Sequence, residues 1–322
     1  MGLRFINYPE FIPKDAYDKL ACRVAEKLLR SKSVCSVYQM GSVKNPGISD
    51  LDIIAIFNDG SACDVNIQEG LSGQDSLILT HGSFGIPRSK INLSQSYNFL
   101  TNLNLLGGED LHLLEEPDSE MLKELKVQIA LEYMLKMYIT LDAQITFGII
   151  KLRSFLLQAK AIIFDLELLG IRDGELYNIV MKVIEIRNNW FNKAPELSEL
   201  QNLVVSFQKE LKTVLDEMFH DSVYSLPSEK LKITRNMSIQ MGDSFLRTHK
   251  GVVLPAFFSF FGKKYVNVQN RINSFEYTVP YTLPEADSLI AKRALFFNEL
   301  VDINKNNYPG FIPTTTSLNA YN

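Results

Sequence analysis

Residues Val37–Phe57 read VYQMGSVKNPGISDLDIIAIF, and this stretch decides how the first third of the chain folds. It begins with a short apolar segment, passes through polar and turn-forming residues, and ends in the apolar run Ile53–Phe57. Because side chains alternate across a β-strand, Asp50 and Asp52 point to the same face, about 7 Å apart along it. The stretch therefore predicts two strands joined by a polar loop, with two carboxylates where the second strand begins.

Two carboxylates that face the same way need a positive partner. At that separation and an intermediate dielectric they repel each other by about 1 kcal/mol or more. A hard divalent cation with oxygen ligands is the natural candidate. Before the loop, Gly41 lets the backbone approach a ligand closely, and Ser42 offers a hydroxyl and an N–H to a phosphate oxygen. Taken alone, Gly41-Ser42 is simply a tight turn, and an isolated Asp-x-Asp usually caps one.

The coincidence of these features resembles the signature of the polymerase-beta-like nucleotidyltransferase superfamily. That signature is an apolar strand, a Gly-Ser turn, a short loop and an acidic pair opening the next apolar strand, matched here by Gly41-Ser42 and Asp50-Leu51-Asp52. The resemblance covers roughly the first third of the chain. It implies an enzyme that moves a nucleoside monophosphate from a nucleoside triphosphate, such as ATP, to a hydroxyl acceptor and releases pyrophosphate. Asp50 and Asp52 would be catalytic and would hold Mg²⁺ or Mn²⁺.

The same resemblance assigns the nucleotide side of the site. Gly41 and Ser42 would hold the β- and γ-phosphates, with Ser49 and Lys44 assisting from the loop. Arg88, which follows the next apolar run, is a further candidate for binding the triphosphate. Lys44 and Arg88 are explained equally well as solvated loop cations. The acceptor is not encoded in any motif, so a small molecule, a sugar and a protein hydroxyl all remain open.

One family feature is missing from the sequence. The apolar run SLILTHGSF, Ser76–Phe84, predicts a third strand, on which the superfamily usually carries a third acid. Here Asp75 stands at its start and His81 occupies the middle, where the acid is expected. His81 is kept as a candidate catalytic residue, although Mg²⁺ prefers oxygen ligands and a lone His is often a hydrogen-bonded structural residue. The third ligand is therefore Asp75, His81 or water.

The missing acid supports a second hypothesis from a different class. The chain would keep the nucleotidyltransferase fold as a catalytically silent module that binds a nucleotide or a partner protein, in the manner of an antitoxin. Retention of Asp50 and Asp52 beside Gly41-Ser42 argues for the enzyme, because this combination has little structural purpose.

Composition excludes several other classes. The net charge of -4 over 322 residues gives no broad basic surface, which disfavours long nucleic acid as a partner. The 3 cysteines have no metal-type spacing, as expected for reduced thiols in a cytoplasmic protein. No signal peptide is evident, and no apolar run reaches the ~20 residues that would span a bilayer, so no membrane partner is expected.

The remaining chain predicts an α+β protein in three parts. A small mixed β-sheet core with helices, residues 1–118, would be the catalytic domain, and it includes a helix at Pro13–Arg30. A helical bundle, residues 119–226, would hold the acceptor. Residues 227–322 would form a small β-containing region with a final helix and a loose tail from Asn304 onward. Its strands are expected at Lys230–Gln240, Gly251–Val268 and Phe275–Tyr281.

Overall fold

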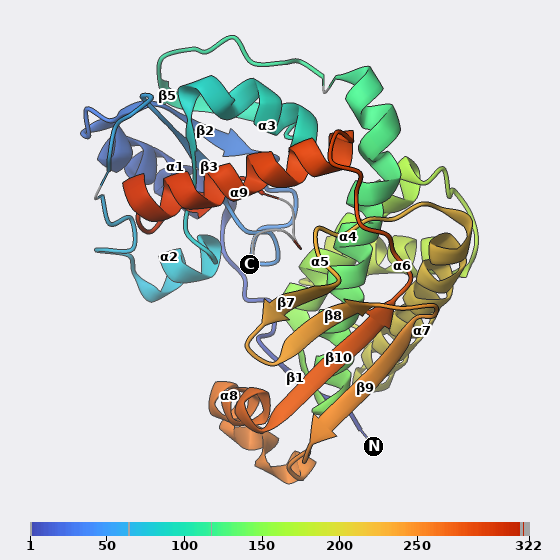
Figure 1. The fold of residues 1–322 in the computed structure, drawn as a ribbon. Helices are drawn as coiled ribbons and strands as arrows, with labels where there is room; N and C mark the ends of the chain where they lie inside the picture. Colours follow the sequence, from blue (N-terminus) through green and yellow to red (C-terminus); the bar gives the residue numbers. More distant parts are fainter. Residues whose placement is uncertain (1, 64, 117, 316–317, 319–322) are drawn as a thin grey trace. The chain divides into compact units, whose positions relative to one another are not determined.

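The computed structural model describes residues 2–63, 65–116, 118–315 and 318. It has the expected α+β fold, with three separate sheets and a helical region in mid-chain (Figure 1). Its contacts divide the chain into two compact units. The first, called here the sheet unit, is Glu10–Leu125 with the segment that begins at Ala291. The second, the bundle unit, is Lys126–Ile290 with the residues up to Pro9.

These units differ from the three contiguous parts expected from the sequence, for two physical reasons. The final helix and strand return to the first sheet, so the sheet unit is discontinuous. The mid-chain helices and the strands after residue 227 pack around a shared core, so they form one unit instead of two. None of the helices in the described part of the chain has both the length and the hydropathy that crossing a bilayer requires.

The sheet unit is built on a five-stranded sheet in the order β11-β4-β3-β2-β5. The central strand β3 is antiparallel to β2 and parallel to β4, so both strands predicted around the Gly-Ser turn are confirmed. All residues of the apolar run Ile53–Phe57 are fully buried, as expected for a strand covered on both faces. The bounds are β2 Val34–Met40, β3 Asp52–Phe57, β4 Phe84–Pro87, β5 Leu103–Gly108 and β11 Ile312–Pro313.

Helix α1, Lys14–Leu29, covers one face of this sheet. Its buried residues recur at helical spacing and share a core with Val37, Ile53 and Ala55 of the strands. Tyr17 also fixes the loop between β2 and β3, because its hydroxyl donates to the Ser49 carbonyl and accepts from the Gly47 N–H, both at 2.8 Å. Helix α1 therefore holds the sheet and the loop that carries the acidic pair.

The predicted strand at Ser76–Phe84 is wrong. The segment begins in helix α2, Gly73–Ile78, turns, and reaches the short strand β4 only at Phe84. The helix starts because Ser72 and Asp75 form a reciprocal capping box, in which each side chain accepts the other residue's N–H. Gly82, with φ +89°, lies in the turn before β4.

The second helical layer of the sheet unit comes from both ends of its sequence. Helix α3, Ile91–Asn98, follows the 3₁₀ turn η1, Arg88–Lys90, and packs against α9, Leu289–Asn307, through Tyr97, Phe296 and Phe297. The expectation of a loose tail from Asn304 onward is wrong for the described residues up to 315. Asn304 donates to the Gly85 carbonyl at 3.0 Å, and β11 pairs with β4. Residues 316–317 and 319–322, where the same expectation fell, lie outside the described part.

The bundle unit confirms the predicted run of helices. The long helical pattern divides at Gly148, which has φ +69°, and the short strand β6, Ile149–Lys151, follows and pairs with β1, Arg4–Ile6. The helices are α4 Ser119–Thr146, α5 Leu152–Leu168, α6 Glu175–Asn189 and α7 Leu197–Asp221.

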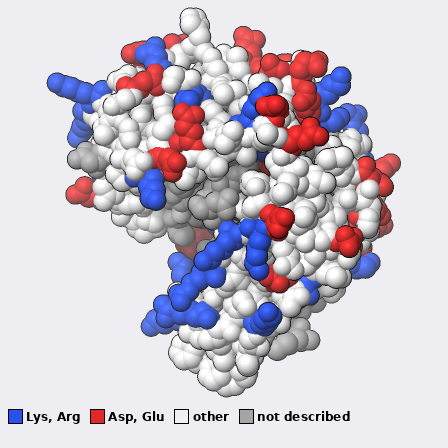
Figure 2. Space-filling model, viewed as in Figure 1, with Lys and Arg blue, Asp and Glu red and all other residues white. Residues whose placement is uncertain are grey.

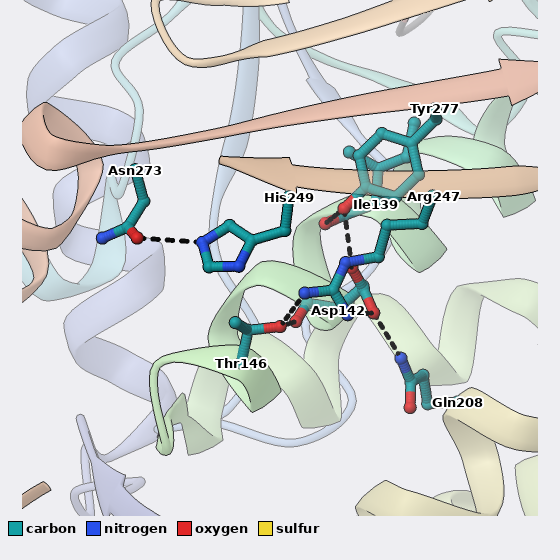
Figure 3. Close-up of polar contacts among 8 residues, drawn as sticks. All are labelled: Ile139, Asp142, Thr146, Gln208, Arg247, His249, Asn273 and Tyr277. Atoms are coloured by element: carbon teal, nitrogen blue, oxygen red, sulfur yellow. Dashed lines mark hydrogen bonds and ion pairs between the residues drawn. The ribbon is translucent and has the colours of Figure 1, made fainter. Parts of the chain in front are cut away.

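A four-stranded sheet in the order β7-β8-β10-β9 completes the bundle unit. Its buried face is attached to the helices by Asp142 of α4, which accepts hydrogen bonds from Tyr277 at 2.8 Å and Gln208 at 2.9 Å (Figure 3). Arg247 of the neighbouring strand forms an ion pair with Asp142 at 3.1 Å. The strands are β7 Lys230–Thr234, β8 Met237–Met241, β9 Leu246–Gly251 and β10 Asn273–Val279.

The strand predicted across Gly251–Val268 is wrong. This aromatic and β-branched stretch forms a 3₁₀ helix, η2 Ala256–Phe261, and helix α8, Lys263–Ile272. Pro255 precedes η2, and Gly262, with φ +55°, separates the two helices. Tyr265 and Gln269 are buried four residues apart, a helical spacing that outweighs the strand propensity of the neighbouring residues.

Candidate functional site

Asp50, Asp52 and His81 come together at the end of the sheet where β3 begins. The Nε2 atom of His81 lies 3.5 Å from Oδ2 of Asp50 and 3.0 Å from Oδ1 of Asp52. The ligand atoms of the three side chains lie within 4.8 Å of one another. Within the described part of the chain, no other group of three His, Cys, Asp or Glu side chains is close enough to share a metal ion in this way.

Backbone contacts between distant segments position this cluster. Asp52 is the first residue of β3 and pairs with Met40, the last residue of β2. The N–H of Leu51, between the two acids, donates to the Ile78 carbonyl at the end of α2, at 3.0 Å. His81 lies three residues beyond that carbonyl, in the turn before β4. The contact between Leu51 and Ile78 therefore places the turn that holds His81 next to Asp50 and Asp52.

Asp75, the other candidate for the third ligand, is not part of the cluster. Its carboxylate accepts the Ser72 N–H at 2.9 Å and forms an ion pair with Arg23 of α1 at 2.7 Å. Burial raises the pKa of Asp75, but the hydrogen bonds from Ser72 and Arg23 outweigh it and leave that pKa below its usual value. Asp75 thus holds α2 in place, and of the two protein side chains proposed for the third corner the structure brings only His81 there.

The charges of the cluster depend on His81. Hydrogen bonds to Asp50 and then Asp52 raise the pKa of His81 to about 10, so the metal-free imidazole is protonated at neutral pH. Burial raises the pKa of Asp52, and the hydrogen bond from His81 opposes that shift. Among the ion pairs between described residues, neither Asp50 nor Asp52 has a Lys or Arg partner. In the cluster, the positive charge of the protonated His81 side chain therefore balances the acidic pair Asp50 and Asp52.

This donor set fits a divalent metal ion. Two carboxylate oxygens and one imidazole nitrogen lie within 4.8 Å of one another, and no lysine or arginine of the described residues forms an ion pair with the acids. Mg²⁺ favours oxygen-only sites, whereas Mn²⁺ and later first-row metals accept imidazole more readily. Because a ligating imidazole must be neutral, ion binding would release the proton that His81 carries.

The Gly41-Ser42 turn lies directly beyond Met40 and is therefore next to the start of β3. Gly41 has φ +66°, and a Cβ at this position would meet no atom within 4 Å, so the turn is open on that side. The N–H of Gly41 donates to the Asn102 carbonyl at 3.0 Å, which commits it to the protein backbone. Ser42 is exposed, so of this pair it is the better phosphate donor.

The two loop candidates differ in what they contact. Ser49 is buried, its Oγ accepts the Asn45 N–H at 3.4 Å, and its carbonyl accepts the Tyr17 hydroxyl. These contacts give Ser49 the role of holding the loop. Lys44 is exposed on the same loop and forms no ion pair with a described residue. Tyr17, which anchors the loop, was identified from the sequence only as a core residue of the helical pattern.

Arg88 is not brought to the cluster. Strand β4 is parallel to β3, with Pro87 beside Phe57, so Arg88 follows the end of β4 that is farthest from Asp52. Five residues of strand separate Phe57 from Asp52, which corresponds to roughly 17 Å. Arg88 instead pairs with Glu109 at 2.7 Å. The predicted contact between Arg88 and the triphosphate therefore has no support in the geometry of this sheet.

No protein-family model matches this chain, and neither a curated protein nor a solved structure was found that matches it. Fold and site geometry therefore carry the functional argument.

Proposed function

We propose that the protein is a metal-dependent nucleotidyltransferase that transfers a nucleoside monophosphate from a nucleoside triphosphate to a hydroxyl acceptor. The observation that carries this proposal is the convergence of Asp50, Asp52 and His81 beside the Gly41-Ser42 turn. The order of helix, strand, Gly-Ser turn, loop and acid-bearing strand in the sheet unit supports it as well. The acceptor is a small molecule, a sugar or a protein hydroxyl.

In this proposal each side chain has a defined task. Asp50, Asp52 and His81 hold the divalent ion. When bound, such an ion supplies positive charge against the phosphates and lowers the pKa of an attacking hydroxyl. The Ser42 hydroxyl and N–H donate to a phosphate oxygen, and Lys44 adds a cation from the same loop. Catalysis by these residues is then mostly positioning and electrostatic stabilisation.

His81 gives this site a metal preference. An imidazole in place of a third carboxylate lowers the negative charge that a bound ion meets, and it adds a softer nitrogen donor. We therefore expect Mn²⁺ to bind more tightly than Mg²⁺. We also expect the affinity for either ion to increase with pH, because the ion displaces the His81 proton.

A second candidate function is favoured by the same histidine. The imidazole lies within 3.5 Å of both carboxylates, where a metal ion would otherwise balance them. If it stays there, the acidic pair is already neutralised and the domain would be a silent module that binds a nucleotide or a partner protein. The two candidates differ in whether a divalent ion replaces the proton.

Calorimetric titration of the chelator-treated protein separates the two candidates. The enzyme hypothesis expects Mn²⁺ binding, nucleoside triphosphate binding that requires Mn²⁺, and pyrophosphate release with a suitable acceptor. Asp50→Asn and Asp52→Asn should abolish all three while the protein stays folded. Asp18→Asn, on the exposed face of α1, is the matched control and should change none of them. Nucleotide binding that is unaffected by metal and by either site variant would favour the silent module.

A further inference from the structure

Four exposed phenylalanines lie next to one another in the bundle unit. In η2 the exposed fractions are 66% for Phe257, 36% for Phe258, 58% for Phe260 and 53% for Phe261. A 3₁₀ helix has three residues per turn, so residues three apart share a face. Phe257 therefore shares a face with Phe260, and Phe258 shares one with Phe261. The ring centroids of Phe257 and Phe258 are 4.0 Å apart, as are those of Phe260 and Phe261. The η2 helix therefore presents a continuous aromatic surface to solvent.

A buried polar network holds this surface in place. The Tyr265 hydroxyl of α8 lies 3.0 Å from both the Phe147 and the Leu254 carbonyls and accepts from Gln269 at 2.6 Å. Asn273, at the start of β10, donates to the Gln269 carbonyl at 3.0 Å. The buried side of α8 is thus hydrogen-bonded to the rest of the unit, and Ser259 between the two pairs of rings is buried. Clustered exposed apolar side chains of this kind mark interaction surfaces.

The Lys, Arg, Asp and Glu side chains of the segment that contains η2 and α8 have one sign of charge. Between Asp243 and Glu276 the sequence contains five cations and no acid, although the chain as a whole has a net charge of -4. One of these cations, Arg247, is paired with Asp142. The remaining four are exposed: Lys250, Lys263, Lys264 and Arg271. Figure 2 shows uncharged surface at the end of the bundle unit that carries η2, with Lys and Arg side chains beside it.

We propose that η2 and α8 form a docking surface for an anionic lipid bilayer. The four phenyl rings would enter the boundary between headgroups and acyl chains, and the four cations would contact anionic headgroups. A second copy of the chain is a poorer occupant of a symmetric contact at this surface, because it would place the same cations opposite one another. The contact is peripheral, since no described helix meets the requirements for crossing the bilayer. This proposal is independent of the nucleotidyltransferase proposal.

Sedimentation of the full chain with vesicles tests the proposal. We expect binding to vesicles of phosphatidylcholine with 30% phosphatidylserine, weaker binding at high salt, and little binding to phosphatidylcholine alone. Replacing Lys263 and Lys264 by Ala should lower the partition coefficient roughly twenty-five-fold, because each lysine near an anionic surface contributes about fivefold. Replacing Phe257 and Phe260 by Ser should lower the partition coefficient by about tenfold for each phenyl ring that the wild type buries in the bilayer.

Matched controls separate docking from general surface effects. Phe164→Ser removes an exposed phenylalanine of α5 that also has a lysine over its ring, and Lys126→Ala with Lys193→Ala removes two exposed cations of the same unit. Neither control should change vesicle binding. A Phe257→Trp variant should show a blue-shifted emission with the anionic vesicles only. The proposal is overturned if the wild type does not sediment with anionic vesicles at low salt, or if the controls weaken binding as much as the η2 variants. The proposal is likewise overturned if the wild type forms oligomers that are lost on replacing Phe257 and Phe260 and does not bind vesicles. That result would assign the surface to a second copy of the chain.

Discussion

Replacing His81 by Asp should lower the stability of the metal-free protein and raise its affinity for Mg²⁺. In the metal-free protein, the imidazolium lies 3.0 Å from Asp52 and 3.5 Å from Asp50. The substitution removes both attractions and introduces a third carboxylate at the same corner. Because Asp is shorter than His, the new charge lies roughly 6 Å from the other two, where each pair repels by about 0.7 kcal/mol in water and about 2.8 kcal/mol at an effective dielectric of 20. We expect the free energy of unfolding of the chelator-treated protein to fall by about 2–4 kcal/mol.

Mg²⁺ should reverse this loss, because three carboxylates are the ligand set that it prefers. At a free concentration one hundred times the dissociation constant, ion binding contributes about 2.7 kcal/mol to the free energy of unfolding. Urea denaturation with EDTA and with Mg²⁺ measures both effects. His112→Asp, at an exposed histidine of the same unit, is the matched control and should show neither. Equal metal-free stability of H81D and the wild type, or an equal Mg²⁺ effect on H112D, would show that His81 does not neutralise the acidic pair.

Three further predictions concern positioning and stability. Tyr17→Phe should lower the free energy of unfolding by about 1–2 kcal/mol, because it leaves the buried loop groups without their hydroxyl partner, whereas Tyr8→Phe, at an exposed tyrosine, should change it little in the same urea titration. Ser72→Ala removes the cap of α2 and should cost about 1 kcal/mol, and it should weaken Mn²⁺ binding measured by calorimetry because the turn that holds His81 directly follows α2. Burial raises the pKa of Asp165 in the folded protein well above its usual value. The contribution of Asp165 to stability is therefore complete at pH values below its pKa in the unfolded chain, and it is lost as the pH rises through its pKa in the folded protein. The stability of Asp165→Asn relative to the wild type should therefore increase from pH 4 to pH 8, and a pH-independent difference in urea midpoint would contradict this account.

The elements around the Gly-Ser turn were predictable because their pattern is local. The apolar alternation and turn residues of Val37–Phe57 define β2, the loop and β3 without reference to the rest of the chain. The position of His81 was not predictable in the same way. The capping pair Ser72 and Asp75 is visible in the sequence, but the contact between Leu51 and Ile78 joins segments that only the folded chain brings together.

Long-range structure also decides two further points. Arg88 follows an apolar segment, but the parallel direction of β4 relative to β3 places it at the end of the sheet opposite Asp52. The aromatic segment around η2 has strand propensity, yet it forms helices because Tyr265 and Gln269 bury one face of α8. In both cases the tertiary environment, and not the local pattern, decided the outcome.

In our proposal, Asp50, Asp52 and His81 hold one divalent ion. Electron paramagnetic resonance of free Mn²⁺, titrated into the chelator-treated protein, measures the binding of that ion. We expect Mn²⁺ binding by the wild type and by Asp18→Asn that increases with pH, and loss of that binding in the Asp50→Asn, Asp52→Asn double variant. Equal Mn²⁺ binding by the wild type and the double variant, or none by either at millimolar Mn²⁺, would contradict it.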